Sequence, residues 1–79
     1  TFSIVNEYKT ETNQTVFHFD LFRLEEEEAA YDMGIDEYFD SGNWCFIEWP
    51  EKTPNLIPDE HHVIQFELID ENTRKIIFK

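Results

Sequence analysis

Cysteine, basic residues and long apolar runs are all scarce in this sequence. Cys45 is the only cysteine among 79 residues, so no disulfide framework is possible, and we expect a reducing, cytoplasmic setting. Six Lys and Arg stand against 18 Asp and Glu, and the resulting net charge of −12 repels a phosphate backbone. No apolar stretch approaches the roughly 18 residues of a membrane span. We therefore expect neither direct nucleic-acid binding nor a membrane anchor.

Glycine is also scarce, because the chain contains only Gly34 and Gly42. A Gly-x-x-x-x-Gly-Lys-Ser/Thr phosphate-binding loop cannot be built from these residues. The 79-residue chain alone is therefore not expected to hydrolyse a nucleoside triphosphate. It begins on Thr1 rather than on Met, which favours a piece of a longer protein.

Aromatic residues, by contrast, are plentiful. They supply 16% of the chain, and apolar residues supply 41%, so a hydrophobic core is expected despite the high charge. A domain of about this size buries only about 60% of the surface of its unfolded chain. We expect residues 1–79 to form a single, partial domain with a thin margin of stability.

The first quarter of the chain predicts a β-hairpin. Thr1–Tyr8 alternates in polarity, Lys9–Gln14 is a polar loop, and Thr15–Arg23 is rich in aromatic and β-branched residues. The two strands should be antiparallel. Alternation along the second strand gives it two faces. The predicted core face carries Phe17, Phe19 and Leu21, and the opposite face carries Val16, His18 and Asp20.

The middle of the chain predicts a helix followed by a buried strand. Glu25–Met33 has helical propensity and ends at Gly34, a suitable C-terminal cap. Asp36 is expected to cap a short helical turn over Glu37–Phe39. The apolar run Trp44–Trp49 before a proline is typical of a strand buried on both faces, as in the middle of a parallel sheet.

The end of the chain predicts a closing hairpin, His61–Ile69 and Arg74–Phe78, around a turn. The element order indicates an α/β fold with a mixed sheet. One helix covers one face only, whereas a central strand needs cover on both faces, so part of the fold is expected to lie outside this chain.

Two acids at strand ends are the candidate functional residues. Asp20 and Glu48 each end an apolar strand, and ligands of open α/β sheets collect at the carboxyl ends of strands. Carboxylates there bind Mg²⁺ directly or through its water. The alternative is that each acid is simply solvated. His18 shares a face with Asp20 and is expected either to orient that carboxylate or to be a satisfied core histidine.

Four blocks of the sequence, in order and spacing, resemble the TsaE family. They are Thr1–Tyr8 (TFSIVNEY), His18–Leu24 (HFDLFRL), Gly34–Phe39 (GIDEYF) and Ile47–Glu51 (IEWPE). The resemblance covers about two thirds of the chain, and the second and fourth blocks are its most specific part.

This resemblance implies a three-layer, P-loop NTPase-like fold, truncated at the N-terminus. It implies an ATPase that, when intact, binds ATP and Mg²⁺ and supports threonylcarbamoyladenosine modification of tRNA with the TsaB–TsaD complex. Carried over residue by residue, Glu48 is the magnesium ligand and Asp20 a second catalytic acid near the metal or its water. Thr1 lies near the γ-phosphate, and Trp49 lies beside the nucleotide.

The chain departs from the family pattern in two further places. Only Thr1 and Phe2 remain of the family's Ser-Pro-Thr-Phe segment, and Phe22 replaces the Tyr of its His-Phe-Asp-Leu-Tyr-Arg block. The first departure concerns the geometry of Thr1, whereas the second retains an aromatic ring.

Two other functions remain open from the residues alone. In the first, the chain is a non-catalytic interaction module whose acidic surface docks on a basic protein partner. A glycosidase with Asp20 and Glu48 as paired acid and base is the weaker alternative, because no sugar-binding groove can be argued from the sequence.

Overall fold

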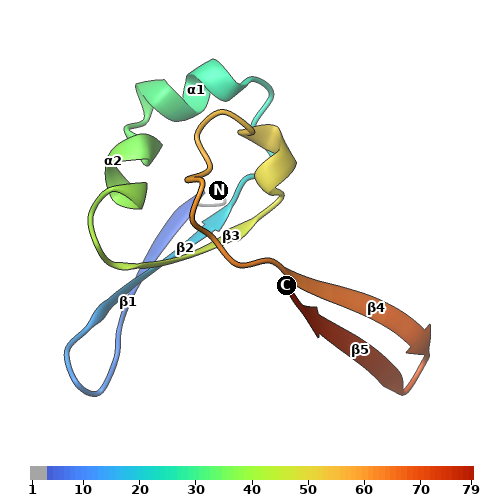
Figure 1. The fold of residues 1–79 in the computed structure, drawn as a ribbon. Helices are drawn as coiled ribbons and strands as arrows, with labels where there is room; N and C mark the ends of the chain where they lie inside the picture. The colour runs from blue at the N-terminus through green and yellow to red at the C-terminus, as the bar shows by residue number, and fades with distance from the viewer. Residues whose placement is uncertain (1–3) are drawn as a thin grey trace.

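The computed structural model describes residues 4–79, so the predicted site residue Thr1 and the start of the predicted first strand lie outside the described residues. The elements in chain order are β1 (Val5–Lys9), β2 (Thr15–Asp20), α1 (Glu27–Asp32), α2 (Ile35–Phe39), β3 (Trp44–Glu48), the 3₁₀ turn η1 (Pro50–Lys52), β4 (Ile64–Asp70) and β5 (Thr73–Phe78) (Figure 1). The chain is mixed α/β, as predicted.

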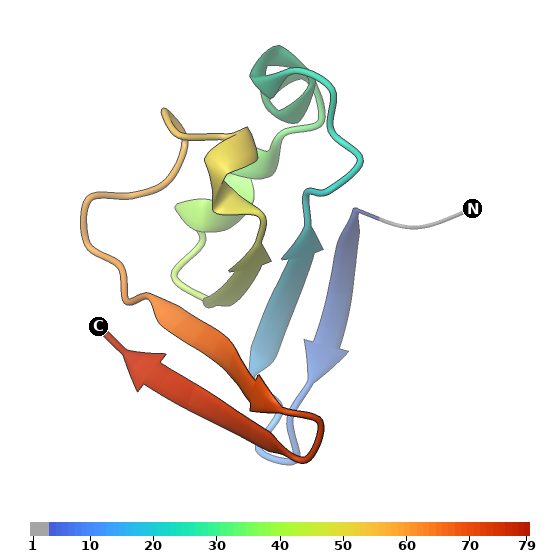
Figure 2. The same ribbon diagram turned by 90° about the vertical axis from the view of Figure 1, so that its right-hand side faces the viewer.

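Strands β1, β2 and β3 form one mixed sheet with β2 in the centre. β1 is antiparallel to β2, which confirms the predicted first hairpin, and β3 is parallel to β2. A parallel neighbour requires a crossover connection, and α1 and α2 supply it. Both helices lie over the same side of the sheet (Figures 1 and 2).

The core forms between this helical layer and the near face of β2. Phe17 and Phe19 of that face, with Leu21 just beyond it, are 8%, 0% and 0% exposed, so the predicted core face is confirmed. The opposing layer contributes Leu24, Ala30 and Ile35. Aromatic rings also pack between the two layers. The ring centroids of Phe19 and Phe39 are 5.0 Å apart in an edge-on arrangement.

The helices differ in their limits from the sequence prediction. α1 begins at Glu27 rather than Glu25, because Glu26 still has extended backbone angles (φ −139°, ψ 144°). Gly34 follows α1 in the left-handed region (φ 74°), as expected of its terminating role. α2 then begins at Ile35, without the predicted cap by the side chain of Asp36.

The predicted burial of β3 on both faces is wrong. Its Cys45 and Ile47 pack against the core, but Trp44 and Phe46 on the other face are 64% and 49% exposed. β3 is also an edge strand of the described sheet. An apolar run indicates that a strand needs other protein packed on both faces. It does not indicate that residues 4–79 supply that packing.

β4 and β5 form a separate two-stranded antiparallel sheet, which confirms the predicted closing hairpin. The hairpin extends away from the three-stranded sheet (Figure 1). One of its faces is apolar and largely exposed, with Ile64, Phe66, Leu68, Ile76 and Phe78 between 45% and 69% exposed. Within residues 4–79, no helix has both the length and the apolar character needed to cross a membrane.

Candidate functional site

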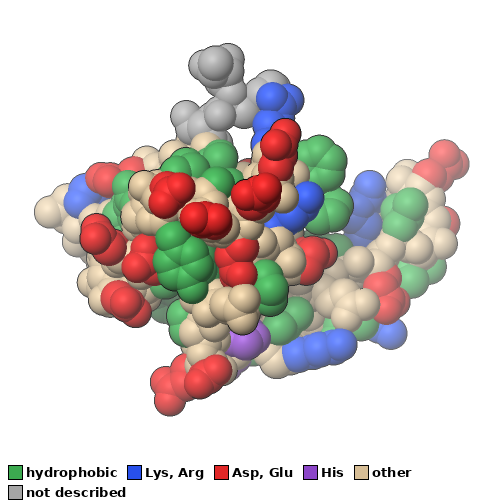
Figure 3. All heavy atoms as spheres, turned by 90° about the horizontal axis from the view of Figure 1, so that it is seen from above, with side chains coloured by type: hydrophobic (Ala, Val, Ile, Leu, Met, Phe, Trp, Pro, Cys, Tyr) green, Lys and Arg blue, Asp and Glu red, His purple; other side chains and the backbone are tan. Residues whose placement is uncertain are grey.

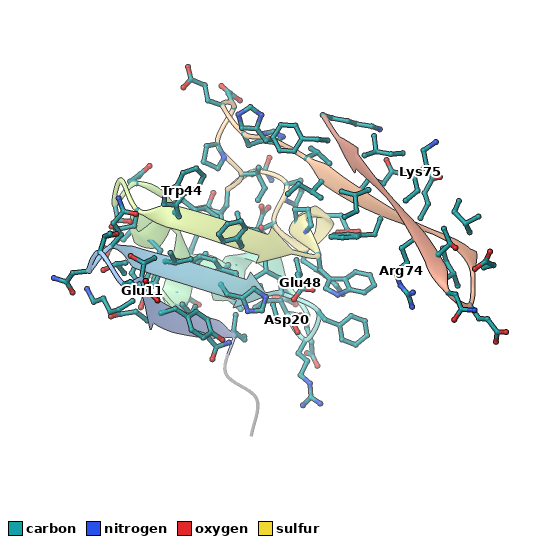
Figure 4. The ribbon with its side chains drawn as sticks, turned by 90° about the horizontal axis from the view of Figure 1, so that it is seen from below. Glu11, Asp20, Trp44, Glu48, Arg74 and Lys75 are labelled. Atoms are coloured by element: carbon teal, nitrogen blue, oxygen red, sulfur yellow. The ribbon has the colours of Figure 1, made fainter. Side chains whose placement is uncertain are left out.

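The two predicted acids lie side by side at one end of the sheet. Asp20 is the last residue of β2 and Glu48 is the last residue of β3, and the two are direct partners in the parallel register. Partners in register point to the same face of a sheet. That face is the one without helices, and both carboxylates emerge at the carboxyl ends of their strands (Figure 4).

The backbone on either side of the pair is held by the ladder. The Asp20 amide donates to the carbonyl of Ile4 at 3.0 Å, and the Leu21 amide donates to the carbonyl of Glu48 at 3.2 Å. Both carboxylates therefore project from hydrogen-bonded backbone rather than from a loose loop.

His18 contacts Glu48 and not Asp20. Its Nε2 atom lies 2.8 Å from Oε2 of Glu48, across the strands and one step diagonally along the ladder. A carboxylate accepts hydrogen bonds only, so Nε2 carries the proton and donates it. Their side chains are 33% and 59% exposed. The expectation that His18 orients Asp20 is thus corrected, because the diagonal across the parallel strands favours Glu48.

Asp20 is oriented by its own strand end. Its Oδ1 atom accepts a hydrogen bond of 3.2 Å from the amide of Phe22, two residues further along the chain. This is the local turn that Asp favours where a strand stops. The carboxylate is consequently fixed relative to the backbone that leaves the sheet.

Two aromatic rings follow the two acids. Trp49 adopts a left-handed backbone conformation (φ 62°, ψ 49°) directly after Glu48, which is uncommon for a bulky residue. The conformation turns the chain sharply into Pro50 and brings the Trp49 ring to 4.9 Å from the ring of Phe22. Trp49 directly follows Glu48 in the chain and is 45% exposed.

The donor set fits a magnesium ion held partly by other ligands. Among residues 4–79 there is no group of three or more His, Cys, Asp or Glu side chains arranged to hold a metal ion. Mg²⁺ is usually bound by one or two carboxylates, with water and phosphate oxygens completing its octahedron. Asp20 and Glu48 match that pattern and would not form a closed, all-protein cage.

The sequence predicted that Asp20 and Glu48 end their strands, and the structure confirms it, but it did not predict two contacts near them. The hydrogen bond from His18 to Glu48 joins β2 to β3, and the ring contact of Phe22 with Trp49 joins the segments that directly follow these strands. Both contacts depend on the parallel register of β2 and β3, in which Asp20 is paired with Glu48 and His18 with Phe46. The sequence does not state that register.

A family profile described as "Threonylcarbamoyl adenosine biosynthesis protein TsaE" matches residues 1–76. The chain is 38% identical over 94% of its length to a tRNA threonylcarbamoyladenosine biosynthesis protein TsaE of Rickettsia felis, and 34% identical over 90% of its length to that of Haemophilus influenzae. The Bacillus subtilis protein of the same name is 32% identical over 99% of the chain. The matches cover 42%, 44% and 48% of these relatives, so the chain spans less than half of their length. The chain therefore belongs to the TsaE family of threonylcarbamoyl adenosine biosynthesis proteins.

Proposed function

We propose that the full-length protein is a P-loop ATPase component that binds ATP and Mg²⁺ and is required for threonylcarbamoyladenosine modification of tRNA. It acts in the cytoplasm with a TsaB–TsaD-type complex and contacts tRNA through those partners rather than through this acidic segment. Residues 1–79 supply the acids of the nucleotide site, and the phosphate-binding loop lies elsewhere in the full-length chain. The relatives are named as tRNA threonylcarbamoyladenosine biosynthesis proteins, which supports this role in tRNA modification.

The observation that carries the proposal is the in-register pairing of Asp20 with Glu48 at the carboxyl ends of parallel strands. Ligands of open α/β sheets bind at this position. The two acids would have been unable to share an ion had they pointed to opposite faces, and their register excludes that arrangement.

Each site residue has a separate role in this proposal. Glu48 holds the cation directly, and Asp20 lies near the metal or orients a water bound to it. When bound with ATP, Mg²⁺ offsets the negative charge of the phosphate oxygens during phosphoryl transfer. Trp49 lies beside the nucleotide, and Thr1 is assigned to the γ-phosphate by the family pattern alone.

Replacing Glu48 tests the proposal. In the full-length protein, Glu48→Ala should abolish Mg²⁺-dependent ATP hydrolysis while leaving the thermal unfolding midpoint nearly unchanged, because its side chain is 59% exposed. The matched control is Glu11→Ala, which removes an exposed acid at the opposite end of the sheet (Figure 4). Unchanged hydrolysis by Glu48→Ala would reject the metal role.

A second function, an acidic module that docks on a basic protein, is favoured by the distribution of charge. Asp and Glu side chains gather over the side of α1 and α2 (Figure 3). The two functions are distinguished by the upstream sequence, where a glycine-rich loop ending in Lys-Ser/Thr supports the ATPase. If no such loop exists, the docking function is the better account.

A further inference from the structure

The side chain of Glu48 is long, has several rotatable bonds and is exposed. Immobilising a Glu side chain costs conformational entropy, because several of its torsions must be fixed. A cation that binds an unrestrained Glu48 must bear this cost, and the cation binds more tightly if the protein restrains the carboxylate beforehand. The strand ladder restrains the backbone of Glu48 but not its side-chain torsions.

His18 supplies such a restraint. Its Nε2–H donates to Oε2 of Glu48 at 2.8 Å, so one carboxylate oxygen is fixed. The imidazole itself projects from the middle of β2, where its ladder partner is Phe46 of β3. It is only one-third exposed, so its own position is better defined than that of Glu48.

A direct role of His18 as a cation ligand fits less well. Its Nε2 is already committed to Glu48, and Mg²⁺ prefers oxygen ligands to imidazole. The hydrogen bond instead matches a common arrangement in metal sites, in which an outer group orients the residue that touches the metal.

We propose that His18 is a positioning residue for the divalent cation: by holding Oε2 of Glu48, it turns Oε1 toward the cation or its bound water. This inference rests on the proposed function, because it requires Glu48 to be a ligand. Asp20 is held separately by the Phe22 amide, so His18 orients one acid of the pair and not both.

Two substitutions of His18 separate positioning from simple loss of a side chain. The amide nitrogen of Gln reaches the place of Nε2, whereas that of Asn reaches only the place of Nδ1. In the full-length protein with ADP, His18→Asn should weaken Mn²⁺ affinity, measured by electron paramagnetic resonance, about 10-fold. His18→Gln should retain most of the affinity. Thermal unfolding of both variants checks that the fold is equally stable.

Glu48→Ala in the same titration distinguishes a failure of the proposed function from a failure of the positioning role of His18. If it leaves Mn²⁺ affinity unchanged, the proposed function itself fails. If it weakens binding while His18→Asn and His18→Gln both match the wild type, only the positioning role is overturned.

Nuclear magnetic resonance of the histidine nitrogens tests the contact without replacing His18. The wild-type full-length protein should show His18 with its proton on Nε2, and Glu48→Ala should shift the Nε2 signal or redistribute the proton between the two nitrogens. Identical His18 signals in the two proteins would overturn the inference, because the hydrogen bond would then be absent in solution.

Discussion

Cys45 illustrates how a single residue is made unreactive. Its thiol lies in β3 on the core side and donates to the carbonyl oxygens of Tyr38, at 3.5 Å, and Asn43, at 3.6 Å. Burial raises the pKa of the Cys45 thiol above its ordinary value. Since the thiolate is the nucleophilic form, Cys45 has the properties of a packing residue.

Alkylation of Cys45 should therefore be slow. In the folded full-length protein at pH 7.5, the rate with iodoacetamide at this position should be several-fold lower than in denaturant. Peptide mass mapping measures the extent of alkylation at Cys45. Equal rates in the folded and denatured protein would contradict the assigned burial.

The raised pKa of Cys45 also affects stability at high pH. The free energy of unfolding should fall as pH rises above the ordinary thiol pKa, because the thiol loses its proton in the unfolded state before it does so in the folded state.

Among the elements, the junction of α1 and α2 depends on one glycine. Gly34 has φ 74°, and its amide donates to the carbonyl of Tyr31 at 3.0 Å, while its carbonyl accepts from Glu37 at 3.1 Å. It thus ends one helix and begins the next. A Cβ at this position would meet only the carboxylate of Glu37 at 3.8 Å, an ordinary contact, so the cost of a side chain lies in the backbone conformation.

Gly34→Ala should lower the unfolding free energy of the full-length protein by about 1–2 kcal/mol, the cost of a left-handed conformation for an L-residue. Gly34→Asn should lower it by less, because Asn tolerates this region. Urea denaturation followed by circular dichroism measures both. A loss as large for Asn as for Ala would indicate that steric contact, rather than backbone strain, sets the cost.

Elements governed by local patterns were predictable, whereas relations between distant elements were not. The alternation along β2 predicted its core face because that period is a property of neighbouring residues. The acids at the ends of β2 and β3 were found for the same reason. The contact of His18 with Glu48 depends on the register of two strands separated by two helices, and no local pattern encodes it. The burial of β3 was wrong because the pattern cannot identify what covers a strand.

The whole chain distributes charge and apolar surface unevenly. Residues 1–59 contain 14 Asp and Glu against three Lys and Arg, whereas residues 60–79 contain four against three. On the face of the sheet opposite the helices, Trp44 and Phe46 stack with their ring centroids 6.3 Å apart, although both are exposed. Exposed aromatic pairs of this kind mark a surface that normally lies against other protein.

The three-layer fold that we propose for the full-length protein would supply that cover, and the fluorescence of Trp44 tests for it. With Trp44 as the only tryptophan of the full-length protein, after Trp49→Phe and replacement of any tryptophan outside residues 1–79, acrylamide should quench its fluorescence several-fold less in the folded than in the denatured state. Its 64% exposure within the 79 residues alone would not give such protection. The reciprocal protein with Trp49 alone is the control, since we propose that Trp49 lies beside the nucleotide, and it should then gain protection when ATP and Mg²⁺ are added. Free quenching of Trp44 in the folded protein would mean that a second helical layer does not cover this face, and the P-loop NTPase-like architecture would have to be abandoned even if Glu48 proved essential.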